Sequence, residues 1–78
     1  MSVKEEHAVA QALELLHTAN LKYGRKVSAG EFAKVMGVSR NTAYNRLMAL
    51  VALDLCQWES QPYKKGFCMR YAAVGGFK

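Results

Sequence analysis

The middle third of the chain carries hydrophobic positions with a helical period, in two short blocks on either side of Gly37. The apolar positions three and four residues apart are Phe32, Val35 and Met36 in the first block and Ala43, Leu47 and Leu50 in the second. Glycine suits the left-handed conformation of a tight turn between helices. The pattern therefore predicts helices over about 29–36 and 40–53, joined as a helix-turn-helix.

A residue that can cap each helix stands directly before it. Ser28 and Ser39 have side-chain oxygens that can accept hydrogen bonds from backbone N–H groups of the first helical turn. Glu31 stands three places after Ser28, which is the spacing of a capping box. These caps place the starts of both helices.

Residues 2–23 form a longer helical block that contains no glycine or proline and ends before Gly24. One stripe along this block consists of Val9, Leu13, Leu16 and Asn20, and beside it lie Ala8, Ala12, Leu15 and Ala19. The apolar arc is wider than a small core requires. Two explanations stay open, namely further burial within the domain and a contact between two copies in a homodimer.

Two strands are predicted at about 55–59 and 67–74, separated by a loop that contains proline, glycine, Lys64 and Lys65. Such a pair is typical of a β-hairpin. We expect Trp58, Phe67 or Cys68, and Tyr71 to cover the helical core. The expected registers place residue 57 or 58 opposite Cys68, so Cys56 and Cys68 are predicted to be buried free thiols rather than a disulfide.

The run F-A-x-x-M-G-V-S-R-N-T-A-Y-N-R-L-x-x-L, residues 32–50, resembles the helix-turn-helix of winged-helix DNA-binding domains in small transcriptional regulators. About residues 27–74 fit that pattern. The resemblance implies an α+β, mainly α fold, a single domain over 1–78 with three helices and a C-terminal β-hairpin wing. The family usually has glycine before the first wing strand, where this chain has Asp54, a residue that tolerates the left-handed conformation.

Charge is divided unevenly along the chain. Residues 1–21 carry a net charge of −2 and residues 22–78 a net charge of +7, which together give the formal +5. The basic excess therefore coincides with the helix-turn-helix and the wing. It favours a polyphosphate partner, double-stranded DNA, over a basic domain without such a target.

The side of the second motif helix that faces away from its apolar stripe carries polar residues near its start. Its outward positions are Asn41, Asn45, Met48, Ala49 and Ala52, flanked by Thr42 and Tyr44. Asparagine pairs with adenine, arginine with guanine or phosphate, and the threonine methyl group with thymine. The predicted DNA-binding residues are Ser28, Ser39, Arg40, Asn41, Thr42, Tyr44, Asn45, Arg46, Lys64 and Lys65. Lys22, Arg25 and Lys26 are predicted either to touch phosphates or to form a solvated turn.

No nucleophile, base or metal-ligand spacing suggests an enzyme, so we expect neither catalytic residues nor a cofactor nor a metal. The N-terminus and the lack of a long apolar run predict a cytoplasmic protein that enters no membrane. Two alternative functions stay open. One is a winged-helix protein-protein assembly module, and the other is an accessory DNA-binding role in plasmid or phage replication, partition or packaging.

Overall fold

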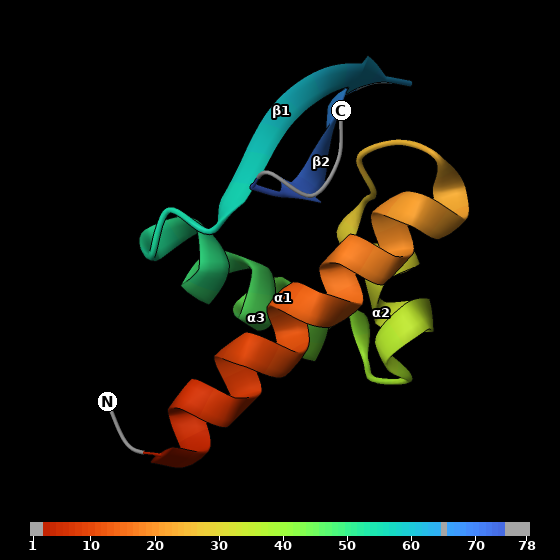
Figure 1. The fold of residues 1–78 in the computed structure, drawn as a ribbon. Helices are drawn as coiled ribbons and strands as arrows, with labels where there is room; N and C mark the ends of the chain where they lie inside the picture. Colours follow the sequence, from red (N-terminus) through yellow and green to blue (C-terminus); the bar gives the residue numbers. More distant parts are fainter. Residues whose placement is uncertain (1–2, 65, 75–78) are drawn as a thin grey trace.

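The computed structural model describes residues 3–64 and 66–74, with side chains from His7 onward. Its elements are α1 (Val3–Tyr23), α2 (Ala29–Met36), α3 (Arg40–Ala52), β1 (Cys56–Tyr63) and β2 (Gly66–Ala73). The helices pack together, and the antiparallel hairpin stands to one side of them (Figure 1). This α+β, mainly helical arrangement is a winged-helix-like layout, and the predicted fold class is confirmed.

The turns form where the local sequence predicts them. The Ser28 Oγ accepts a hydrogen bond from the Glu31 N–H at 3.2 Å, and the Glu31 carboxylate accepts one from the Ser28 N–H at 3.0 Å. Gly37 ends α2 in the left-handed conformation with φ of 73°. Asp54 has φ of 58°, so aspartate takes the position where the resembled family has glycine. Both ends of the helix-turn-helix are thus defined by side chains and backbone of a few neighbouring residues.

The core lies where all three helices meet the base of the hairpin. Its fully buried side chains include Leu16 and Ala19 from α1, Phe32 from α2, Leu47 and Leu50 from α3, and Val27 and Tyr71 beside them. Ala12 and Ala19 are buried within this domain, and Leu15 packs half-buried against the core. For these residues the wide apolar arc of α1 is explained by burial in the domain itself.

The hairpin is longer than predicted. The expected loop over 60–66 is mostly strand, because β1 continues to Tyr63 and β2 begins at Gly66. Pro62 is tolerated because β1 is an edge strand, where a missing N–H costs little. Lys64 has φ of 51°, which fits a two-residue turn that follows the twist of the strands. Lys65, predicted to bind DNA from this turn, lies outside the described residues.

The predicted strand register is also wrong. Cys68 lies opposite Gln61, and Cys56 lies opposite Ala73. Both cysteines are free, as expected, but only Cys56 is buried, whereas Cys68 is half-buried. Burial raises the pKa of the Cys56 thiol to about 11. That thiol is therefore protonated and unreactive at neutral pH.

Hydrogen bonds from two segments fasten β2 to the helical body. Val27 and Tyr71 exchange both backbone hydrogen bonds, at 2.9 and 2.7 Å, and so form an isolated β-bridge beside the two-stranded sheet. Asn20 of α1 is completely buried; its Nδ2 donates to the carbonyl oxygens of Tyr71 and Arg25, and its Oδ1 accepts from the Ala73 N–H. This amide, which the sequence pattern placed on an otherwise apolar stripe, pins the wing to α1.

Tyr71 covers the core as predicted, with 2% of its surface exposed, but Trp58 and Phe67 do not. Trp58 is 54% exposed and Phe67 is 75% exposed. The reason is the strand order. β2 bonds to Val27 and Asn20 and so reaches the core, while β1 and the distal part of the hairpin extend past the helices. Across residues 3–64 and 66–74, no helix has the length and apolar character needed to cross a bilayer.

Candidate nucleic-acid interface

The first two turns of α3 present a polar surface to solvent from a rigidly held helix. Its inward stripe, Ala43, Leu47 and Leu50, is completely buried. The exposed side chains are Arg40, Asn41, Tyr44, Asn45 and Arg46. Asn41, Tyr44 and Asn45 face away from the buried stripe, and Arg40 and Arg46 stand at the two sides of this exposed surface. Because the opposite stripe fixes the rotation of α3, that surface has a defined direction.

Three of the predicted site residues are engaged in capping. The Ser39 Oγ accepts a hydrogen bond from the Thr42 N–H at 3.2 Å and donates one to the Thr42 Oγ1 at 3.0 Å. Ser28 caps α2, as described above. These hydroxyls hold the starts of α2 and α3, and the half-buried Thr42 presents less surface than the asparagines on either side of it.

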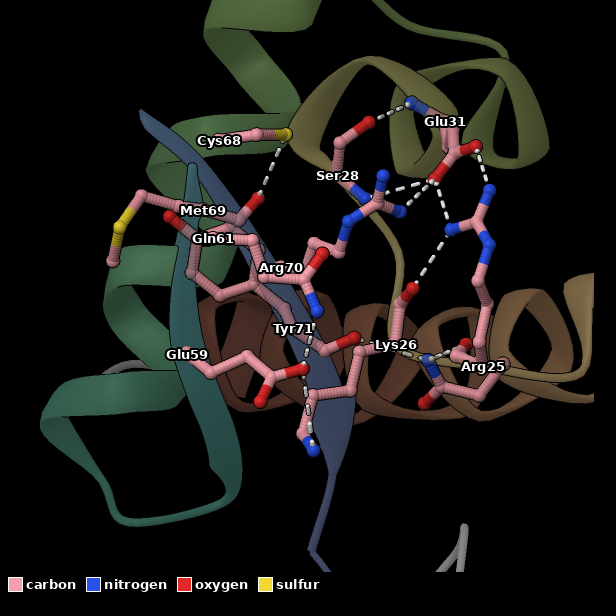
Figure 2. Close-up of polar contacts among 11 residues, drawn as sticks. Arg25, Lys26, Ser28, Glu31, Glu59, Gln61, Cys68, Met69, Arg70 and Tyr71 are labelled. Carbon is pink, nitrogen blue, oxygen red and sulfur yellow. Dashed lines mark hydrogen bonds and ion pairs between the residues drawn. The ribbon is translucent and has the colours of Figure 1, made fainter. Parts of the chain in front are cut away.

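The basic residues between α1 and α2 are neutralised by acids. Arg25 donates two hydrogen bonds to the Glu31 carboxylate, at 2.8 and 2.6 Å, and Arg70 approaches the same carboxylate from β2 at 3.6 Å (Figure 2). Lys26 lies 3.8 Å from Glu59. Arg25 and Lys26 thus each lie beside an acid, whereas Lys22 is exposed, and a phosphate contact by any of the three stays a prediction.

Glu31 is the centre of this cluster. The hydrogen bonds from Arg25 and then from the Ser28 N–H lower its pKa from 4.5 to about 2, against the opposing effect of partial burial. The same hydrogen bond with Glu31 raises the pKa of Arg25. One carboxylate thus caps α2 and joins the segment between α1 and α2 to α2 and β2. We name Arg25, Glu31 and Arg70 the Glu31 cluster.

Arg70 was not identified from the sequence. Its Nε and Nη1 are shielded from solvent and make no hydrogen bond within the described part of the chain, while Nη1 faces Glu31 at 3.6 Å. The register places Arg70 opposite Glu59, but Glu59 approaches Lys26 instead. Cross-strand position alone would have predicted an ion pair between Arg70 and Glu59. Only the packing of β2 against the start of α2 brings Arg70 to Glu31.

An apolar groove runs between α3 and the hairpin. One part of it has a volume of about 230 Å³ and is lined by Tyr44, Met48, Val51, Trp58, Met69 and Tyr71. Past Tyr44 and Met69 the hollow continues toward the start of α2, where its lining includes Arg40, Tyr63, Phe67 and Cys68. Arg70 and Arg40 line a neighbouring hollow that shares Tyr63 and Cys68. We call the first two hollows, which share Tyr44, Met69 and Tyr71, the helix–wing groove.

The helix–wing groove corrects one detail of the predicted site. Met48 and Ala49 were placed on the solvent side of α3, but both are half-buried, and Met48 lines the groove and packs against the core. The aromatic wall was missed because its formation depends on the hairpin register. With Trp58 opposite Tyr71 and Ser60 opposite Met69, alternation along the strands would have placed Trp58 and Met69 on one face.

The tip of the wing carries an exposed cation. Lys64 is exposed, and its Nζ lies 5.3 Å from the centre of the Tyr63 ring. Among residues 3–64 and 66–74, Arg40, Arg46 and Lys64 form no ion pair. These three side chains are therefore the positive charges that α3 and the wing tip offer to a partner. The asparagines on α3 add amide groups that can form hydrogen bonds.

No set of three or more His, Cys, Asp and Glu side chains that could hold a metal ion occurs within the part of the chain described here. No family model matches the chain, and no curated protein or solved structure matches it significantly. The function of this surface is therefore inferred from its geometry and chemistry.

Proposed function

We propose that the protein binds double-stranded DNA sequence-specifically, as a small transcriptional regulator, with α3 in the major groove and the wing on the backbone. One observation carries this proposal. Arg40, Asn41, Asn45 and Arg46 are exposed together on the first half of a helix whose other side is completely buried. The major groove admits an α-helix, and these side-chain types match base edges and phosphates.

The residues have distinct roles in this proposal. Asn41 and Asn45 lie one turn apart and each has an amide that can donate to and accept from adenine. Arg40 contacts guanine or a phosphate, and Arg46 contacts a phosphate. Lys64 at the wing tip supplies charge to the backbone without selecting sequence. Tyr44 adds an aromatic surface beside the asparagines.

The test compares base-reading and backbone-binding variants. Asn41→Ala and Asn45→Ala should each weaken binding to the preferred site by about 1 to 3 kcal/mol and leave binding to random duplex unchanged. Lys64→Ala should weaken binding to both duplexes alike, because a phosphate contact carries no sequence information. Leu21→Ala, which removes an exposed side chain from the side of α1 away from Ala8, is the control. Competition binding with selected and random duplexes measures all four variants.

The reverse pattern would contradict the assignment. If Lys64→Ala abolished discrimination while both asparagine variants bound like the wild type, the wing would be the element that selects sequence. A binding constant that did not change with salt would instead favour the second candidate, a protein-protein assembly module. The exposed apolar surface of the helix–wing groove is the observation that supports that candidate.

We also propose a homodimer that forms through α1. Two copies related by a two-fold axis would sum the free energies of two half-sites about one helical turn of DNA apart. Ala8 is half-buried and lies before the part of α1 that forms the core, so Ala8→Glu should weaken association without unfolding the monomer. Leu15 is a poorer choice because it packs against the core. Light scattering that shows a monomer at high concentration, with and without duplex, would exclude the dimer.

A further inference from the structure

We propose that the helix–wing groove binds unpaired bases of single-stranded DNA, with Trp58 as the principal stacking surface. This inference rests on the proposed DNA binding, because the same cationic surface supplies the phosphate contacts. It extends that function from intact duplex to single strands and locally opened duplex. The duplex proposal assigns no role to the aromatic residues of the hairpin.

The first argument is the exposure of large aromatic side chains on one short hairpin. Trp58, Tyr63 and Phe67 are all more than half exposed, although the nearby Tyr71 is completely enclosed. A domain of this size has few aromatic residues with which to build a core. Trp58 and Phe67 lie on the same face of the hairpin, and exposed apolar surface of this kind marks an interaction site. These side chains are consequently available to a partner.

The second argument is the shape of the site. Tyr44 and Met48 of α3 form one wall, and Trp58 and Met69 of the hairpin form the other. The hollow between them is open to solvent and almost free of polar atoms. A planar base offers two apolar faces to such walls, and stacking on aromatic side chains tolerates every base. In an intact duplex those faces are occupied by neighbouring bases, so the site suits unpaired nucleotides.

The third argument is charge. Arg40 lines the groove where it approaches the start of α2, and Lys64 lies at the wing tip beside Tyr63, which lines the same part. The nearby acid Glu31 is already bound by Arg25 and Arg70. Cations at the rim and aromatic residues inside form the combination used to bind single strands. A second copy that docked here through its residues 22–78, which carry a net charge of +7, would instead bring like charges together.

Trp58 provides a direct measurement, because it is the only tryptophan in the chain. Tryptophan emission should fall when the full-length protein is titrated with oligo(dT) of about 12 nucleotides, a length within the range that single-strand sites occupy. A duplex of equal length should change the emission far less. A decrease that depends on protein concentration without DNA would show a second copy in the groove and would overturn the proposal.

Labelled oligonucleotides test the same contact by anisotropy. Trp58→Ala should weaken binding of oligo(dT) by about 10-fold to 100-fold, which corresponds to one lost stack, and change duplex binding by less than about 3-fold. Trp58→Phe should restore most of the affinity. Leu21→Ala, which removes a 63% exposed apolar side chain from α1, is the control. Because Trp58 is exposed, its variants should keep the thermal unfolding of the wild type.

The two proposals can fail separately. Duplex binding without oligo(dT) binding, or equal oligo(dT) affinity of the wild type and Trp58→Ala, would overturn the stacking site and leave the duplex proposal intact. Oligo(dT) binding with quenching but no duplex binding would support the groove and overturn the duplex proposal. Absence of binding to either DNA would overturn both.

Discussion

The Glu31 cluster and the helix–wing groove lie next to each other and use basic residues in opposite ways. In the cluster, Arg25 and Arg70 share one carboxylate, and their charge joins three segments of the fold. Along the groove and α3, Arg40 and Arg46 form no ion pair within the described residues. A count of basic residues therefore overstates the charge that a protein offers to a partner.

Aromatic side chains on the two strands of the hairpin also differ in role. Tyr71 on β2 is buried beside Val27 and serves the core, whereas the exposed Trp58 on β1 lines the open groove. These two residues are direct cross-strand partners. The bonding of β2 to Val27 and Asn20, which β1 lacks, separates the structural residue from the candidate binding residue.

The largest effect is expected where the wing is fastened to the helical body. Asn20→Leu keeps a side chain of similar size but leaves the buried Ala73 N–H without its acceptor, so the free energy of unfolding should fall by about 2 to 4 kcal/mol. Leu21→Ala, at the next and exposed position, should change it by less than about 0.5 kcal/mol. Urea unfolding measures both. Equal stability of the two variants would show that the wing is held without this amide.

An intermediate effect is expected on the salt dependence of duplex binding. About four phosphate contacts should give a slope of log K against log [salt] of about −3 to −4, and Arg40→Gln with Arg46→Gln should reduce its magnitude by about 2. The double variant Arg25→Gln, Glu31→Gln should leave the slope unchanged, because it removes a pair that is already neutral. A reduced slope for that double variant would mean that the Glu31 cluster opens to bind phosphate.

The smallest effect is expected on stability at low pH. Glu31 has a pKa of about 2 in the folded protein and an ordinary value of 4.5, so the folded state binds its proton more weakly than the unfolded chain. Its stabilising contribution is therefore complete above about pH 4.5 to 5 and disappears as pH falls toward 2. Glu31→Gln keeps a capping side chain but should lose up to about 1 kcal/mol at neutral pH and flatten the acid dependence.

Thermal unfolding from pH 7 to pH 2 compares this variant with the wild type. Glu59→Gln is the matched control, because its contact with Lys26 spans 3.8 Å and should contribute less. If Glu31→Gln and the wild type lost stability in parallel across this range, the stabilisation assigned to the Glu31 cluster would be wrong.

The local part of the fold was predictable from neighbouring residues. Both motif helices were predicted to within a residue of their observed bounds from Ser28, Glu31, Gly37 and Ser39. This was possible because helix caps depend on contacts three or four positions away. The apolar stripe of α3 likewise identified which side faces solvent, so Asn41 and Asn45 were found. The DNA contact of Lys65 stays a prediction, because Lys65 lies outside the described residues.

The hairpin shows where such local rules stop. Pro62 and Gly66 indicated a long loop, yet both lie in strands. A proline is compatible with a strand only when that strand lies at an edge, and the sequence does not state which strand that is. The position of the turn then set the strand register. The register in turn decided on which face of the hairpin Trp58 and Met69 lie.

By itself, then, the sequence determined the helix boundaries, the exposed face of α3 and the basic character of the C-terminal region. These properties follow from side chains a few positions apart, because helix geometry relates them directly. Only the tertiary structure decided which basic residues are free. Arg25 and Arg70 are 45 positions apart in the sequence, and they meet at Glu31 because β2 packs beside the start of α2. The helix–wing groove depends in the same way on long-range packing, since Met69 and Tyr71 of β2 line it and are held beside α3 by the docking of the wing on the core.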